Sequence, residues 1–196
     1  MFSNSDGEYL VKLARNTIKT YLEKKQIAFD NSNPKFLERR GIFVTLETNP
    51  KKELRGCMGY TLPTKSLNIG TSESALNAAF FDSRFPPLKP NEFDKILIEV
   101  SILTPLQPFN AKRIEYLNLV QIGKDGLYIQ KDEISAVILP QIAKQEKWTS
   151  EEFLCQISYK AGLSPDAWLD KSTHLFKFQS QNFTESAPNG KVVPTS

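Results

Sequence analysis

The run Arg55-Gly56-Cys57-Met58-Gly59 is the first place where the sequence offers chemistry. The thiolate is the reactive form of cysteine, and a neighbouring cation such as Arg55 lowers the pKa of a thiol from its free value of about 8.5. Cys57 is therefore a candidate catalytic nucleophile or redox thiol. Free cysteine is also among the most buried residue types and often serves only as a small apolar side chain, so packing is the alternative interpretation.

The same run is a candidate ligand-binding segment. The guanidinium group of Arg55 is suited to hold a carboxylate or a phosphate through two parallel hydrogen bonds. Gly56 and Gly59 have no side chains and would let a ligand approach the backbone. Two glycines weaken a strand unless its backbone bends or is closely approached, which sets this segment apart from an ordinary strand.

Asp82, Ser83 and Arg84 form a second candidate binding segment. They follow a predicted helix and precede Pro86 and Pro87, which cannot continue a helix and which stiffen the chain. A helix end held by two prolines would point Asp82 and Arg84 in fixed directions. The alternative is an ordinary helix stop, at which the two charged side chains pair or meet solvent.

Other common kinds of site are not indicated. His174 is the single histidine, so a Cys-His pair or a Ser-His-Asp triad would depend on it, and its place in a predicted strand favours a structural or surface role. The Gly-x-Ser-x-Gly segment of many hydrolases and the glycine-rich phosphate loops are missing. Cys57, Cys155 and His174 are solitary, whereas a structural zinc site needs four ligands. The sequence predicts no metal and no cofactor.

The composition narrows the class of protein. A chain of 196 residues with 40% hydrophobic and 24% charged residues is expected to fold, as one domain or as two closely packed lobes. A net charge of +3 without a concentrated basic face does not indicate nucleic-acid binding. No apolar run reaches the roughly 20 residues that span a bilayer, and the first residues do not resemble a signal peptide. We therefore expect no membrane association, a cytoplasmic location and two free thiols.

Apolar spacing and turn signals predict the elements around the two candidate segments. A capping box at residues 5–8 predicts the start of the first helix. Residues 41–48 and 54–60 are expected to form a β-hairpin, whose second strand would carry Arg55, Cys57 and Gly59 on one face. A helix over residues 67–81 is expected to stop near Asp82, because two prolines follow.

The rest of the chain alternates between strand and helix patterns. Residues 95–103 show the clearest strand alternation, and residues 119–122 and 127–130 are expected to pair across Asp125-Gly126. Further elements are a strand over 134–139, a helix from Pro140, a helix from the capping box at 149–152 to Gly162, and a strand over 175–178. We expect an α+β fold with a mixed β-sheet flanked by helices, a single domain over residues 1–180, and a poorly structured C-terminal tail over residues 181–196.

The segment Leu54-Arg55-Gly56-Cys57-Met58-Gly59 resembles the LRGCIG hexapeptide of the AMMECR domain family, with methionine in place of isoleucine. Other segments follow the order of that family along nearly the whole chain. They are Gly41-Ile42-Phe43-Val44-Thr45-Leu46, Asp82-Ser83-Arg84-Phe85-Pro86-Pro87-Leu88, Val100-Ser101-Ile102-Leu103-Thr104-Pro105, Gly123-Lys124-Asp125-Gly126-Leu127, Leu139-Pro140-Gln141, Phe153-Leu154 and Lys160-Ala161-Gly162-Leu163.

This resemblance implies a larger and a smaller lobe with the hexapeptide at or near the cleft between them, and it implies no established reaction. Family relatives are associated with Memo-type and radical-S-adenosylmethionine proteins, and a vertebrate relative lies in a deletion region linked to Alport syndrome. The leading hypothesis is a protein that binds a small molecule or a partner chain. Its alternatives are a cysteine-dependent enzyme in a modification pathway and a nucleic-acid or gene-expression regulatory module.

Overall fold

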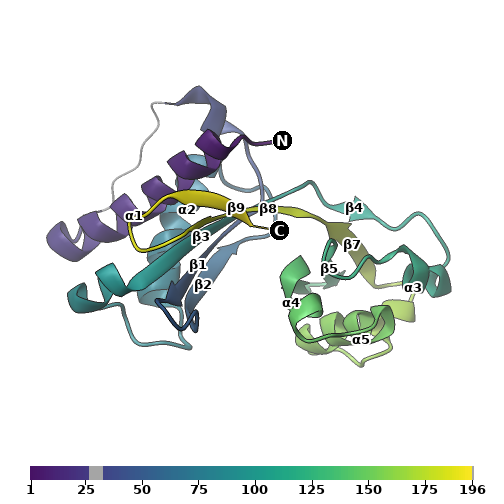
Figure 1. Cartoon of the computed structure of the whole chain (residues 1–196). Coiled ribbons are helices and arrows are strands. Elements are labelled where there is room, and N and C mark those ends of the chain that lie inside the picture. Colours follow the sequence, from purple (N-terminus) through teal and green to yellow (C-terminus); the bar gives the residue numbers. More distant parts are fainter. Residues whose placement is uncertain (27–32, 196) are drawn as a thin grey trace. The chain divides into compact units, whose positions relative to one another are not determined.

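The computed structural model describes residues 1–26 and 33–195, which divide into two units. Unit 1 contains residues 1–103 and 181–196, and unit 2 contains residues 104–180. Each unit has a hydrophobic core of its own and is described separately below. Figure 1 shows the chain entering unit 2 after β3 and returning to unit 1 along β8.

Unit 1 is built on a five-stranded sheet with the strand order β2-β1-β3-β8-β9. Its strands are β1 (Ile42–Thr48), β2 (Leu54–Tyr60), β3 (Ile96–Leu103), β8 (Ser180–Glu185) and β9 (Val192–Thr195). Its helices are α1 (Asn4–Lys24) and α2 (Leu67–Leu76), with the short helical segments η1 (Pro34–Leu37), η2 (Asn77–Phe81) and η3 (Pro90–Lys95). Strand β2 is therefore an edge strand of the sheet.

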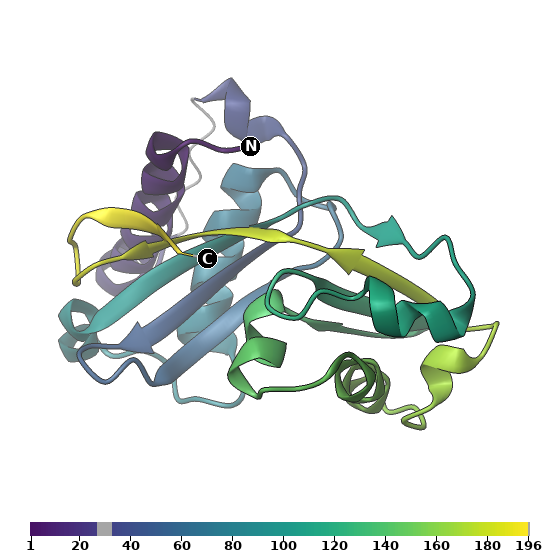
Figure 2. The same ribbon diagram turned by 45° about the vertical axis from the view of Figure 1, so that its right-hand side comes forward.

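Helices α1 and α2 cover one face of this sheet (Figure 2). Alternate side chains of the strands point to that face, because successive residues of a strand point to opposite sides. The core residues are Leu10, Ala14 and Ile18 of α1, Leu67 and Ala75 of α2, Ile42, Val44 and Leu46 of β1, and Ile96, Ile98, Val100 and Ile102 of β3. The opposite face carries Thr45 of β1 and Glu99 of β3, and we call it the polar face.

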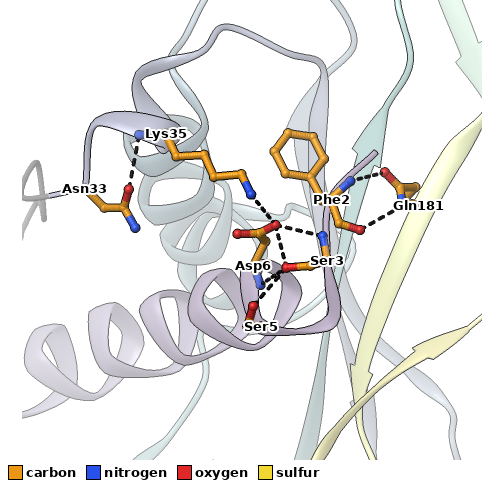
Figure 3. A network of polar contacts seen from close by, with 7 residues as sticks. All are labelled: Phe2, Ser3, Ser5, Asp6, Asn33, Lys35 and Gln181. Carbon is orange, nitrogen blue, oxygen red and sulfur yellow. Dashed lines mark hydrogen bonds and ion pairs between the residues drawn. The ribbon is translucent and has the colours of Figure 1, made fainter.

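The first helix begins two residues before the predicted position. Ser3 is the N-cap residue: its hydroxyl accepts a hydrogen bond from the Asp6 amide, and the Asp6 carboxylate accepts one from the Ser3 amide. Lys35 also contacts this carboxylate, at 2.6 Å (Figure 3). The prediction of a capping box at residues 5–8 is therefore wrong. The observed box lies two residues earlier, because Asp6 at position N3 accepts a hydrogen bond from the Ser3 amide and is also bound by Lys35.

The prediction of a poorly structured tail after Ser180 is also wrong. Residues 180–185 and 192–195 form β8 and β9, and β8 lies beside β3 in the five-stranded sheet. Gln181 exchanges two hydrogen bonds with the backbone of Phe2 (Figure 3). Glu185 points into the core, where it binds Arg15 of α1. Local patterns in residues 181–196 do not predict these strands, because the residues that they contact lie far away in the sequence.

Unit 2 contains a four-stranded sheet with the order β4-β7-β5-β6. Its strands are β4 (Gln107–Pro108), β5 (Gly126–Lys131), β6 (Ile134–Ile138) and β7 (His174–Phe178). Its helices are α3 (Tyr116–Leu119), α4 (Pro140–Gln145) and α5 (Ser150–Lys160), with η4 (Arg113–Glu115) and η5 (Ala167–Leu169). Phe153, Leu154 and Ile157 of α5 pack on Leu127 and Ile129 of β5.

Most local predictions for unit 2 are confirmed, and one is wrong. Helix α5 begins at the Thr149 capping box and is followed by Gly162 at a φ of 76°. Residues 119–122, however, are not a strand: the Asp125 carboxylate accepts a hydrogen bond from the Gln121 amide and closes a local turn. Strand β5 pairs instead with β6, and their turn contains Asp132 at a φ of 52°.

The predicted α+β class is confirmed, with two antiparallel sheets flanked by helices where one mixed sheet was expected. Among the described residues, no helix has both the length and the apolar character that crossing a bilayer requires.

Candidate functional site

Cys57 lies in the middle of the edge strand β2, opposite Thr45 of β1. The Cys57 amide donates a hydrogen bond of 3.0 Å to Oδ2 of Asp82, and its carbonyl accepts one of 3.0 Å from Nη2 of Arg84. These two contacts take the place of a further strand. Unpaired edge strands tend to pair with other chains, so the hydrogen bonds with Asp82 and Arg84 also protect this edge of the sheet.

Asp82 and Arg84 are held together by two hydrogen bonds, of 2.9 Å to Oδ1 and 2.7 Å to Oδ2 of the carboxylate. The Asp82 side chain is buried and that of Arg84 is 56% exposed. Hydrogen bonds from Arg84 lower the pKa of Asp82 to about 2, although burial acts in the opposite direction. The predicted helix stop at Asp82 is confirmed, since η2 ends at Phe81, and the pair that it creates anchors Cys57.

We expect Asp82 to contribute to stability above about pH 4 and to lose this contribution as the pH falls toward 2, because its carboxyl has a lower pKa in the folded chain than in the unfolded chain. The loss should be about 1–2 kcal/mol, after allowance for the exposure of Arg84. Asp82→Asn should be less stable than wild type at neutral pH and should show a flatter acid limb in urea unfolding.

The matched control is Asp166→Asn, which removes an exposed carboxyl from unit 2 and should keep the wild-type acid limb. Equal loss of stability between about pH 4 and pH 2 in wild type and Asp82→Asn would show that the pair with Arg84 contributes nothing to folding.

Arg55 is the extra residue of a β-bulge. Leu46 pairs with Gly56 and Glu47 pairs with Leu54, so no residue of β1 faces Arg55 in the register. We expected Arg55 and Cys57 to point to the same face of β2. The bulge interrupts the alternation of side chains between them, so this expectation does not follow from the observed register.

The Arg55 guanidinium group is buried and binds Glu92 of η3, through hydrogen bonds of 2.8 Å from Nε and 3.2 Å from Nη2. Bonds from Arg55 lower the pKa of Glu92. The third nitrogen, Nη1, is buried and has no hydrogen-bond partner within the described parts of the chain. Arg55 was expected to hold a ligand through two hydrogen bonds, and these two bonds are made to the Glu92 carboxylate instead.

The two glycines of the hexapeptide are sites of close packing. A Cβ atom at Gly56 would overlap the carbonyl oxygen of Ala78 in η2. A Cβ atom at Gly59 would overlap the carbonyl oxygen of Ile42 and the ring of Phe43. The backbone of β2 is closely approached at both positions, as the glycines predicted, and the approaching atoms belong to the protein itself.

The Cys57 thiol is half-buried and accepts a hydrogen bond of 3.3 Å from the Thr45 hydroxyl. Burial raises the pKa of Cys57, and the carboxylates of Asp82 and Glu99 add to this rise. The bond from Thr45 and the charge of Arg84 act in the opposite direction without cancelling it. Burial thus opposes ionisation of the thiol, and Arg55, the arginine expected to lower its pKa, is paired with Glu92.

Glu99, Thr184 and Glu47 lie on the same face of the sheet as Cys57, and sequence reasoning missed them. Thr45 pairs with both Cys57 and Glu99 across the sheet, and Thr184 of β8 donates a hydrogen bond of 2.6 Å to Glu99. Glu47 lies two residues after Thr45 on the polar face. Alternation predicts that each of these residues points away from the core, but only the strand register brings them together.

The remaining residues that the sequence singled out are Ser83, Cys155 and His174. Ser83 is exposed between Asp82 and Arg84. Cys155 and His174 belong to unit 2, in α5 and at the start of β7, and both cysteines are free thiols as predicted. Within residues 1–26 and 33–195, no group of three or more His, Cys, Asp or Glu residues is arranged to hold a metal ion.

The fold and the hexapeptide together define an α+β protein in which an edge strand carries a cysteine held by an aspartate-arginine pair. The family model described as AMMECR1 matches residues 11–183. The chain belongs to the AMMECR1 family, as the resemblance predicted.

Relatives of known sequence or structure agree over nearly their whole length. A protein of Thermococcus gammatolerans is 40% identical over 191 residues, which cover 95% of this chain and 93% of that protein. Protein MJ0810 of Methanocaldococcus jannaschii is 41% identical over 189 residues, with 96% and 94% covered. The crystal structure of the uncharacterized protein PH0010 from Pyrococcus horikoshii has a TM-score of 0.91 and 38% identity, and 96% of each chain is covered. These comparisons give the family and the fold and name no activity.

Proposed function

We propose that this chain is a binding protein whose site surrounds Cys57 on β2 and holds a small molecule or a partner chain without covalent chemistry. The observation that carries the proposal is the geometry around Cys57: Asp82 and Arg84 hold its backbone, and its half-buried thiol accepts a hydrogen bond from Thr45. Burial also raises the pKa of this thiol, which opposes its ionisation. A protonated thiol is a poor nucleophile, whereas it is well suited to packing against a ligand and to donating a weak hydrogen bond.

The residues of the two candidate segments have different roles in this proposal. Cys57 and the half-exposed Arg84 are the side chains that contact the ligand, with the exposed Ser83 beside them. Asp82 orients Arg84 and fixes the Cys57 amide.

Arg55, Gly56 and Gly59 shape the strand that presents Cys57. Arg55 joins β2 to η3 through Glu92, and its buried Nη1 atom is a donor that lacks an acceptor within the described residues. A buried donor without a partner costs free energy, so a ligand oxygen near Nη1 would be stabilised. The glycines allow η2 and β1 to approach the strand closely.

The second hypothesis, a cysteine-dependent enzyme that acts with Memo-type and radical-S-adenosylmethionine-type proteins, requires a reactive Cys57. Such an enzyme needs a thiolate or a general base beside the thiol. The groups that contact Cys57 directly are the hydroxyl of Thr45 and the ion pair of Asp82 with Arg84. None of them takes a proton readily near neutral pH, since the pKa of Asp82 is about 2.

The proposal is tested by the rate of alkylation of each thiol with iodoacetamide as a function of pH, read by mass spectrometry of the separated peptides. We expect Cys57 to react slowly, with a midpoint above the free-thiol value of about 8.5. Thr45→Val should slow it further, because the hydroxyl donates a hydrogen bond to the sulfur. Fast reaction with a midpoint below about 8.5 would favour the enzyme hypothesis instead.

A further inference from the structure

The polar face of the five-stranded sheet carries a row of polar side chains that crosses four strands. Cys57 of β2, Thr45 of β1 and Glu99 of β3 lie side by side in the register, and the hydroxyl of Thr184 in β8 donates a hydrogen bond of 2.6 Å to Glu99. The hydroxyl of Thr45 donates one of 3.3 Å to the sulfur of Cys57. The hydroxyl of Thr195 in β9 also donates to Glu99, at 3.2 Å. Ser101 of β3 donates to the other oxygen of Glu99 at 3.5 Å, so hydroxyl donors from three strands converge on one carboxylate.

Glu99 and Glu47 are two carboxylates of this face that form no ion pair within residues 1–26 and 33–195. Glu99 is paired with Thr45 across the sheet, and Glu47 lies two residues after Thr45 on the same face, so the two carboxylates are diagonal neighbours. Burial raises the pKa of Glu47, and the charge of Glu99 adds to the rise. Lys52 acts in the opposite direction on Glu47 but is exposed. Carboxylates that are taken out of water are ordinarily paired with a cation. The negative charges of Glu99 and Glu47 are therefore not balanced by an ion pair on this face within the described structure.

Asn182 gives a second and independent sign that a donor is missing. It lies two residues before Thr184, and since Phe183 and Glu185 point into the core, Asn182 points to the polar face. It is 8% exposed, and its Oδ1 atom is buried without a hydrogen-bond partner in the described structure. Asn182 pairs in the register with Thr195, which itself contacts Glu99.

We propose that the polar face binds an ammonium or guanidinium group, with the Glu99 carboxylate and Oδ1 of Asn182 as its acceptors and the negative charge of Glu47 nearby. This inference rests on the proposed binding function and names the class of ligand as an amine or guanidine. Such a cation supplies several N–H donors, which suit a carboxylate and a neighbouring amide oxygen. A metal ion would require a compact cluster of ligands, and the described residues contain none.

The two arginines of the site do not argue for an anionic ligand instead. Arg55 is paired with Glu92 and Arg84 with Asp82, each through two hydrogen bonds. The positive charges of Arg55 and Arg84 are therefore balanced by Glu92 and Asp82. The carboxylates of Glu99 and Glu47 leave the polar face with a negative charge.

The test is a titration of the full chain, followed by ¹H–¹⁵N NMR, with n-butylammonium and methylguanidinium as probes. Tetramethylammonium is the control cation, because it carries the same charge without N–H donors. We expect saturable shifts of the Thr45, Glu99, Asn182 and Thr184 amides with the two N–H cations and weaker shifts with tetramethylammonium. Glu99→Gln should weaken binding at least about tenfold, and Asn182→Leu should weaken it several-fold.

Glu38→Gln is the matched control, since Glu38 is an exposed acid of unit 1 that pairs with Arg40 away from the strands of the sheet, and it should bind like wild type. Thermal unfolding of each variant shows whether it is folded, and Glu47→Gln replaces Glu99→Gln if the latter unfolds. Equal binding of all three cations, or equal affinity in wild type and the Glu99 or Glu47 variant, overturns the inference.

Acetate and inorganic phosphate separate the failure of this inference from that of the proposed function. If an anion shifts the Cys57 and Arg84 amides while the N–H cations shift nothing, the binding site stands and the ligand class is wrong. If no probe perturbs the polar face or the Cys57 segment, both proposals lose their support.

Discussion

Replacing Glu185 with alanine should lower the free energy of unfolding by about 3–5 kcal/mol, because the change leaves the Arg15 guanidinium buried without its counter-ion. Glu185 accepts hydrogen bonds from Nε and Nη2 of Arg15 and from the Ile98 amide at 3.1 Å. Arg15 also donates to the Phe93 and Ile96 carbonyls, at 3.1 Å and 2.8 Å. One carboxylate thus joins α1, β3 and β8.

Two controls separate the buried ion pair from a general effect of lost charge. Glu53→Gln removes an acid whose partner, Lys51, is 4.0 Å away in an exposed pair, and it should leave the urea midpoint unchanged. The double variant Arg15→Met with Glu185→Leu removes both charges and should recover much of the lost stability, since an apolar pair of similar volume needs no counter-ion. A loss below about 1 kcal/mol for Glu185→Ala would contradict the expectation.

The same ion pair predicts the behaviour of a truncated chain. A chain that ends at Ser180 lacks Glu185, the Phe183 side chain of the core and the two hydrogen bonds between Gln181 and Phe2. It should therefore be less stable than the single variant Glu185→Ala. A truncated chain that unfolds at the wild-type urea concentration would show that β8 and β9 do not support unit 1.

Gly56→Ala should destabilise the chain by about 3 kcal/mol, because the added methyl group overlaps the carbonyl oxygen of Ala78. A backbone atom cannot rotate away as a side chain can, so η2 must move relative to β2. Asp82 follows directly after η2 and holds the Cys57 amide. We therefore also expect faster hydrogen exchange at the Cys57 amide, measured by NMR.

Gly162→Ala is the matched control for this variant. A Cβ atom at Gly162 meets nothing within 4 Å, and the φ of 76° there costs an alanine about 1–2 kcal/mol. Hydrogen exchange at Cys57 should then match wild type. If both variants lose the same stability, or if Gly56→Ala leaves Cys57 exchange unchanged, the contact with Ala78 does not position the site.

Local sequence patterns were enough to predict most of the helices and strands and to single out the two segments around Cys57 and Asp82. The alternation over residues 95–103, the capping box at Thr149 and the prolines after Asp82 act over a few residues, so their outcome does not depend on distant parts of the chain. The intermixing of these elements was sufficient to predict the α+β class.

Which side chains contact one another depends on the tertiary structure. Cys57 binds Asp82 across 25 positions, Arg55 binds Glu92 across 37, and Arg15 binds Glu185 across 170. Each contact depends on strand register and burial, which local spacing does not encode. The arginine expected to activate Cys57 is paired with a glutamate that is distant in the sequence, and burial raises the pKa of the thiol. A segment that looked like a tail completes the sheet. Long-range pairing and desolvation produce these outcomes, and both depend on parts of the chain that local patterns do not include.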